Sequence, residues 1–140
     1  MNKIFQNFTT NGEKLKRKVG LWIDHREAVI VSIKGDQEEI NSIKSNMEKH
    51  VRFSGEAQSS TEEDIRDRKF TNQLNKYYDE VISSVRDAES ILIVGPGEAK
   101  IEFKKRLENE TQIGKIVALE TTDKMTEPQI AAKVREHFSK

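Results

Sequence analysis

Apolar and polar residues alternate in blocks along the chain, and these blocks predict an order of strands and helices. Two β-rich runs come first, VGLWID at 19–24 and EAVIVSI at 27–33, with His-Arg between them as a tight turn. A second turn at 34–37 leads into a third, weaker strand pattern within 38–53. Three strands joined by short turns predict an antiparallel meander.

The strongest helical pattern lies between residues 70 and 85. Its apolar residues recur at spacings of three and four, which places them on one face of a helix. They are Phe70, Leu74, Tyr77, Tyr78, Val81, Ile82 and Val85. Because Tyr77 and Tyr78 are adjacent, we expect at most one of them to face the core squarely. The preceding stretch, 54–67, is polar and acidic without an apolar period, and it predicts an exposed, mobile loop.

The last third of the chain alternates strand and helix patterns. The continuous apolar runs 90–95 and 115–120 are typical of central strands that are covered on both faces. A helical pattern follows each run, at about 98–108 and at 126–138, and the second opens with a Thr-Glu-Pro-Gln capping sequence. The order β-β-β-α-β-α-β-α predicts a ribonuclease-H-like α/β fold, with a mixed five-stranded sheet and helices packed on its faces.

Composition narrows the function classes only slightly. Lys plus Arg and Asp plus Glu number 24 each, so the net charge of zero predicts no partner. The absence of cysteine excludes disulfides and thiolate metal sites and fits a reducing cytoplasm. No apolar run approaches the roughly 20 residues that span a bilayer. We expect a cytoplasmic protein without a membrane segment, with a flexible basic tail at 1–17 and a single domain at 18–140.

The junction after the run at 90–95 is the most distinctive segment. Gly95 and Gly97 let the backbone turn sharply and let another molecule approach closely. The N–H groups that open the next helix favour an anion, although Glu98 can use them as an internal cap. Positive charge follows at Lys100, Lys104, Lys105 and Arg106. The segment is neither a Walker A loop nor G-x-G-x-x-G, and it predicts either a structural turn or a contact with a phosphate or RNA backbone.

Three segments resemble one protein family. ILIVGPGEAKIEFKKRL, KIVALETTDKMTEPQIAAKV and VGLWIDHREAVIVSIKG are similar to parts of the central domain of the archaeal and eukaryotic peptide-chain release factor and Pelota superfamily. The resemblance covers about 18–138 and implies a ribonuclease-H-like fold. It also implies a translation-associated factor that binds the ribosome or structured RNA, with the junction and the basic clusters at 14–18 and 104–106 as backbone contacts.

The loop after the third strand departs from the release factors. There the family carries Gly-Gly-Gln, which positions water for peptide release, whereas this chain reads Ser-Gly-Glu-Ala-Gln, with Gly55 and Gln58 as loop candidates. The acidic residues beside them disfavour RNA phosphates. Pelota-like members also lack Gly-Gly-Gln and act on stalled ribosomes. The resemblance therefore implies a factor without peptide-release activity and without a cofactor.

Two other hypotheses remain open from the residues. A metal-dependent nuclease would use Asp24 and Glu120, provided that these carboxylates converge on divalent ions. An interaction module would associate with a partner or a second copy through a sheet edge. Trp22 can stack on a base or fill the core. The histidines lack ligand spacing, so we expect no histidine metal site; they are His25, His50 and His137.

Overall fold

The computed structural model describes residues 16–46, 60–110 and 114–139. The element order within these residues confirms the expected α/β arrangement. The elements are β1 (Arg17–Ile23), β2 (Glu27–Lys34), β3 (Gln37–Lys44), α3 (Ser60–Val85), β4 (Ser90–Gly95), α4 (Ala99–Glu108), β5 (Lys115–Thr121) and α5 (Glu127–Phe138).

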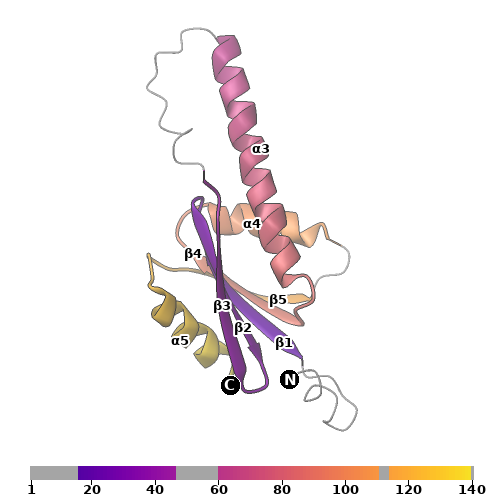
Figure 1. Ribbon diagram of the computed structural model, residues 1–140, viewed down its shortest axis with the longest axis vertical. Coiled ribbons are helices and arrows are strands. Elements are labelled where there is room, and N and C mark those ends of the chain that lie inside the picture. Colours follow the sequence, from indigo (N-terminus) through magenta and orange to yellow (C-terminus); the bar gives the residue numbers. More distant parts are fainter. Residues whose placement is uncertain (1–15, 47–59, 111–113, 140) are drawn as a thin grey trace.

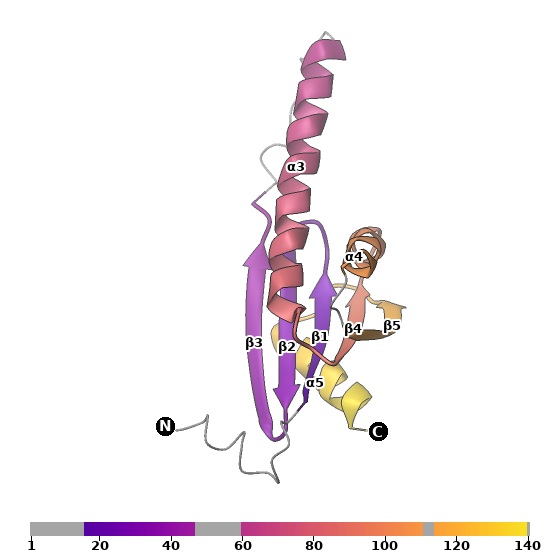
Figure 2. The same ribbon diagram turned by 90° about the vertical axis from the view of Figure 1, so that its right-hand side faces the viewer.

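The strands form one mixed sheet in the order β3-β2-β1-β4-β5. The β1–β2 and β2–β3 pairs are antiparallel, whereas β4 runs parallel to both β1 and β5. Strands β1, β3, β4 and β5 therefore end at the same side of the sheet, as the arrows of β1, β3 and β4 show in Figure 2. We call this side the carboxyl-end edge; the β1–β2 turn and the first residue of β2 also lie there.

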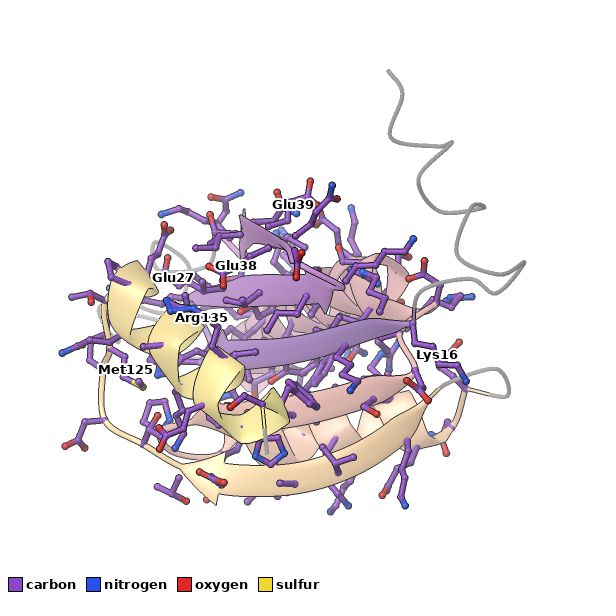
Figure 3. All side chains as sticks on the ribbon, turned by 90° about the horizontal axis from the view of Figure 1, so that it is seen from below. Lys16, Glu27, Glu38, Glu39, Met125 and Arg135 are labelled. Carbon is purple, nitrogen blue, oxygen red and sulfur yellow. The ribbon has the colours of Figure 1, made fainter. Side chains whose placement is uncertain are left out.

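The helices cover the two faces of the sheet unequally. Alternate residues of β1 point to opposite faces, so Leu21 and Ile23 pack with α3 and α4 while Trp22 packs with α5. Each fully buried side chain of this size stabilises the fold by about 1.5–3 kcal/mol relative to an exposed one. Arg135 of α5 also points toward Glu38 of β3, at 3.0 Å (Figure 3), which fixes α5 across the sheet.

The prediction of a loop at 54–67 is wrong from residue 60 onward, because α3 begins at Ser60. Residues 54–59 lie outside the described part of the chain. The first half of α3 projects beyond the sheet (Figure 1). Ile65 in this half is 43% exposed, and Leu74 is the first core residue along the helix. A helix without a buried face needs no apolar stripe, so periodicity could not detect it.

The expectation that only one of Tyr77 and Tyr78 faces the core is also wrong. Each is 2% exposed. The Tyr77 hydroxyl donates to the Asp24 carbonyl at 2.8 Å, and the Tyr78 hydroxyl donates to Glu102 of α4 at 2.7 Å. The two rings are buried together because α3 packs on the sheet with one face and against α4 with the next.

Only the end of the predicted N-terminal tail belongs to the described structure. Residues 1–15 of the predicted tail at 1–17 lie outside the described part of the chain. Its last residue, Arg17, is the first residue of β1. Its guanidinium bonds to Asp87, the Ser32 hydroxyl and the Ser84 carbonyl, so it is not part of a solvated basic cluster.

The predicted capping box at the start of α5 is present. None of the described helices combines the length and apolar character needed to cross a membrane.

Candidate functional site

The two glycines of the junction have different environments. Gly95 ends β4 with φ +154°, and a Cβ there would lie 2.3 Å from the carbonyl oxygen of Ile23. Gly97 has φ +64°, and a Cβ there would meet nothing within 4 Å. Gly95 is therefore required by the contact between β4 and β1, whereas Gly97 is required by its left-handed backbone alone and opens onto free space.

Lys100 is not presented to a ligand, which corrects the sequence prediction for this residue. It is 5% exposed, and its ammonium donates to the Gly97 carbonyl at 2.7 Å. A side chain in the first turn of a helix points back toward the helix start, and this direction brings the ammonium onto the turn. Glu98 precedes α4 without a side-chain capping bond, while its carbonyl accepts the N–H groups of Ile101 and Glu102.

The other predicted cations do not converge on the junction. Lys104 bonds to Glu108 one turn later, at 2.7 Å. The Arg106 guanidinium makes two bonds to Asp79 of α3, at 2.8 and 3.1 Å, which fix α4 against α3. Lys105 is exposed. The α4 cations therefore serve mainly local packing and do not form a single positive surface.

The two carboxylates of the nuclease hypothesis lie apart. Asp24 accepts the N–H groups of Arg26 and Glu27, at 2.8 and 2.9 Å, and Glu120 pairs with Lys133 at 2.8 Å. Because β4 separates β1 from β5, about two strand spacings, roughly 10 Å, lie between the strands that carry them. Two-metal sites hold their ions about 4 Å apart. Among the described residues no His, Asp or Glu trio could hold a metal ion, so the geometry gives the nuclease hypothesis no support.

The aromatic and histidine candidates have structural surroundings. Trp22 is 1% exposed, and its indole N–H donates to the Asp123 carbonyl at 3.1 Å, so the ring cannot stack on a base. His25 lies 3.0 Å from Glu102, and His137 packs edge-on against Phe138. The loop candidates Gly55 and Gln58, like His50, lie outside the described residues.

A pocket of about 290 Å³ opens at the carboxyl-end edge. Three segments contribute to it: the β1–β2 turn, the end of β3 and the loop after β5. We call this cavity the edge pocket. It is lined by Arg26, Glu27, Lys44, Asn46 and Lys124. Three of the five are cations.

Ser45 fixes two of these segments together. It is buried, its N–H donates to the Arg26 carbonyl at 2.9 Å, and its hydroxyl donates to the His25 carbonyl at 2.7 Å. Its own carbonyl accepts the Gln73 side chain of α3 at 3.0 Å. The chain that leaves β3 is thereby held against the β1–β2 turn, so Lys44 and Asn46 stand beside Arg26.

Glu27 positions the two lysines of the edge pocket. Its carboxylate lies 2.9 Å from Lys124 and 3.5 Å from Lys44, its cross-strand neighbour. These contacts, above all the hydrogen bond with Lys124, lower the pKa of Glu27 against an opposing effect of burial. The Lys124 ammonium also lies 4.9 Å from the centre of the Trp22 ring, a cation–π geometry. Both contacts restrict where Lys124 can point.

Sequence reasoning missed the three cations of the edge pocket. They stand alone in the sequence rather than in a basic run, and 80 or more residues separate Lys124 from the other two. Only the strand order brings them together. The usable signal was topological: Lys44 ends β3, Arg26 directly precedes β2, and Lys124 follows β5. A β-meander with parallel crossovers places these strand ends at one edge.

A larger pocket, of about 570 Å³, lies at the opposite edge of the sheet. Arg17 and Lys34 line it together with Glu38 and Glu39. Its cations and carboxylates balance, and the Arg17 guanidinium is already bonded within the fold. We therefore consider the smaller edge pocket the better candidate for a charged ligand.

Comparisons with known proteins support the fold. No protein-family model and no curated protein matches the sequence. Pelota from Thermoplasma acidophilum aligns with a TM-score of 0.57 and 15% identity, over 96% of this chain and 36% of that chain. Pelota from Archaeoglobus fulgidus gives 0.54 and 12%, over 89% and 32%. An archaeal translation termination factor gives 0.48 and 14%, over 88% and 40%.

This chain therefore spans about a third of the length of these Pelota proteins. At such identities the likeness to Pelota shows the fold alone. It confirms the resemblance drawn from the sequence and the mixed-sheet α/β architecture that follows from it.

Proposed function

We propose that this protein is a translation-associated factor that binds ribosomal or other structured RNA in the cytoplasm. The observation that carries the proposal is the fold likeness to Pelota over 96% of the chain. Since one fold hosts many functions, the proposal also needs a surface suited to RNA. The carboxyl-end edge supplies one, because ligands of open α/β sheets bind beyond the carboxyl ends of parallel strands.

The RNA contacts expected at this edge differ in part from those predicted. Gly97 is exposed above open space and allows close approach of a backbone, and Lys105 is exposed on α4. Lys100, Lys104 and Arg106 are bonded within the protein, and Gly95 is packed against β1. The main positive charge of the edge comes instead from the edge pocket. Peptide release is not part of the proposal, because the sequence lacks Gly-Gly-Gln.

Sedimentation with ribosomes tests this proposal. Salt releases proteins that bind through phosphate groups, and six to ten such interactions weaken the affinity by about 10³–10⁵ between 50 and 200 mM salt. We expect the full-length protein to travel with ribosomal particles at low salt and to remain at the top at high salt. A gradient without ribosomes is the control. If the protein stays at the top at low salt as well, the proposal is wrong.

The interaction-module hypothesis receives less support from the structure. The outer strand β3 is exposed along most of its length and carries Glu38, Glu39 and Lys44. Charged side chains on an edge strand work against pairing with a second strand. Light scattering of the purified protein would test self-association directly.

A further inference from the structure

We infer that the edge pocket binds a phosphate group of an RNA backbone, with Arg26, Lys44 and Lys124 as its cationic donors. No sequence motif assigns this site. The inference deepens the proposed function and rests on it for the source of the phosphate. The chemical argument, that the pocket receives a phosphate-type anion, stands on the pocket's own residues.

The donors in the pocket suit a phosphate. Arginine offers N–H groups in a planar fork, lysine offers three rotatable N–H groups, and neither has an acceptor that would repel an oxyanion. The Asn46 amide adds further hydrogen-bonding capacity. With about 290 Å³, the pocket lies just below the range of pockets for drug-sized ligands. Its size therefore fits one anionic group with its neighbouring chain outside, rather than an enclosed nucleotide.

The pocket also has an excess of positive charge. Three cations share one lining carboxylate, that of Glu27. Asp24 also lies near Lys124, but its Oδ1 accepts two backbone N–H groups and it does not line the pocket. The pKa of Lys124 is raised, mainly by the hydrogen bond with Glu27, while the charge of Arg26 acts in the opposite direction. Arg26 and Lys124 line the same pocket, so a bound anion between them would relieve the repulsion of their charges.

Glu27 lowers the entropic penalty of binding. It holds Lys44 and Lys124 on either side of one carboxylate, so both ammonium groups are oriented before a ligand arrives. Arg26 differs, because Glu27 pairs with the two lysines and not with Arg26. Its backbone is fixed by Asp24 and Ser45, and its side chain is exposed, as are those of the lysines. Arg26 is therefore the residue whose substitution should change binding with least effect on folding.

The test uses the full-length protein and two probes, inorganic phosphate and a structured RNA hairpin. Trp22 is the only tryptophan, and its indole N–H bonds to the carbonyl of Asp123, next to Lys124. Its single indole NMR signal therefore reports on the pocket. The variant is Arg26→Gln/Lys44→Gln. The control, Lys34→Gln/Lys115→Gln, removes the same charge at the opposite edge of the sheet.

We expect the RNA hairpin to shift the indole signal, and the pocket variant to bind it about tenfold more weakly while the control binds as wild type. If the RNA binds equally to wild type and both variants, the pocket inference is wrong and the proposed function stands. If phosphate binds through Arg26 and Lys44 but RNA does not bind, the anion site stands and the RNA-binding function is wrong. If neither probe binds, both are wrong.

Discussion

The ammonium group of Lys124 lies 2.9 Å from Oε2 of Glu27, although 97 positions separate the two residues. This ion pair ties the loop after β5 to the first residue of β2. Oε1 of the same carboxylate lies 3.5 Å from Lys44 at the end of β3. One acidic side chain thus holds lysines from two other segments at the carboxyl-end edge.

This arrangement makes stability depend on pH through Glu27. The carboxyl pKa is lower in the folded protein than in the unfolded chain, so its contribution is present above the unfolded value and disappears as pH falls through the folded value. We expect Glu27→Gln to lower the free energy of unfolding by about 0.5–1 kcal/mol near pH 7, since it removes two partly exposed ion pairs. The difference should shrink in acid, as the pH falls below the unfolded glutamate pKa of about 4.3, as measured by urea denaturation at neutral and at acidic pH.

The matched control for this change is Glu39→Gln, on the exposed strand β3. It should leave the unfolding free energy unchanged at both pH values. Equal stability of wild type and Glu27→Gln at neutral pH would contradict the role assigned to the carboxylate.

The two junction glycines should respond differently to alanine. At Gly95 a Cβ meets the Ile23 backbone, which cannot move without separating β4 from β1, so we expect a destabilisation of about 3 kcal/mol or more. At Gly97 only the left-handed conformation is strained, and we expect about 1 kcal/mol. Thermal denaturation measures both, and equal effects would contradict the distinction between a packed and an open glycine.

The buried tyrosines predict cooperative unfolding in alkali. Burial, supported by nearby carboxylates, raises the pKa of both Tyr77 and Tyr78. Folding therefore favours the protonated phenols, and stability falls as pH rises above the unfolded value of about 10. Because the chain has only these two tyrosines, the change in near-ultraviolet absorbance that accompanies tyrosinate formation reports on them alone. Tyrosinate should appear together with the disappearance of circular dichroism; tyrosinate in the folded protein near pH 10 would refute the burial.

Helix α3 should show two levels of protection from hydrogen exchange. Its first half projects from the sheet, and from 64 to 73, where side chains are described, no apolar side chain is fully buried, whereas Tyr77 to Val85 pack in the core. Local opening costs little free energy where little apolar surface is uncovered. We expect amides at 64–70 to exchange at least about tenfold faster than those at 78–85, with helical chemical shifts throughout. Coil-like shifts at 64–70 would restore the loop that the sequence predicts.

The sequence was sufficient to predict the elements whose side chains are buried. The stripe from Leu74 to Val85 and the run at 90–95 carry the pattern of packed elements, and the structure has them within a few residues. The run at 115–120 is a strand, but the prediction that it is central and covered on both faces is wrong. Strand β5 is the outer strand of the sheet, none of its residues is buried, and Leu119 is 37% exposed. The hydrophobic pattern did not predict the first half of α3, because this half projects from the sheet and has no apolar stripe. The burial of both Tyr77 and Tyr78 was not predicted for a related reason. Helix α3 packs against both the sheet and α4, and a pattern that assumes one buried face does not describe this.

The site was harder to predict than the fold. Lys100 follows the junction in the sequence, yet its direction at the start of α4 turns its charge inward onto Gly97. Arg26, Lys44 and Lys124 carry no motif and meet only through the strand order. Local sequence therefore identified the turn, and tertiary structure decided which cations remain available at the edge.

The most direct measurement is the salt dependence of RNA binding by the full-length protein. Fluorescence anisotropy with a labelled RNA hairpin gives the slope of log K against log salt concentration, whose magnitude rises by about 0.7–0.9 for each phosphate that the protein neutralises. We expect Arg26→Gln/Lys44→Gln to reduce the magnitude of the slope by about 1, and Lys34→Gln/Lys115→Gln to leave it unchanged. Equal slopes for wild type and the pocket variant would contradict the claim that RNA binds at the carboxyl-end edge.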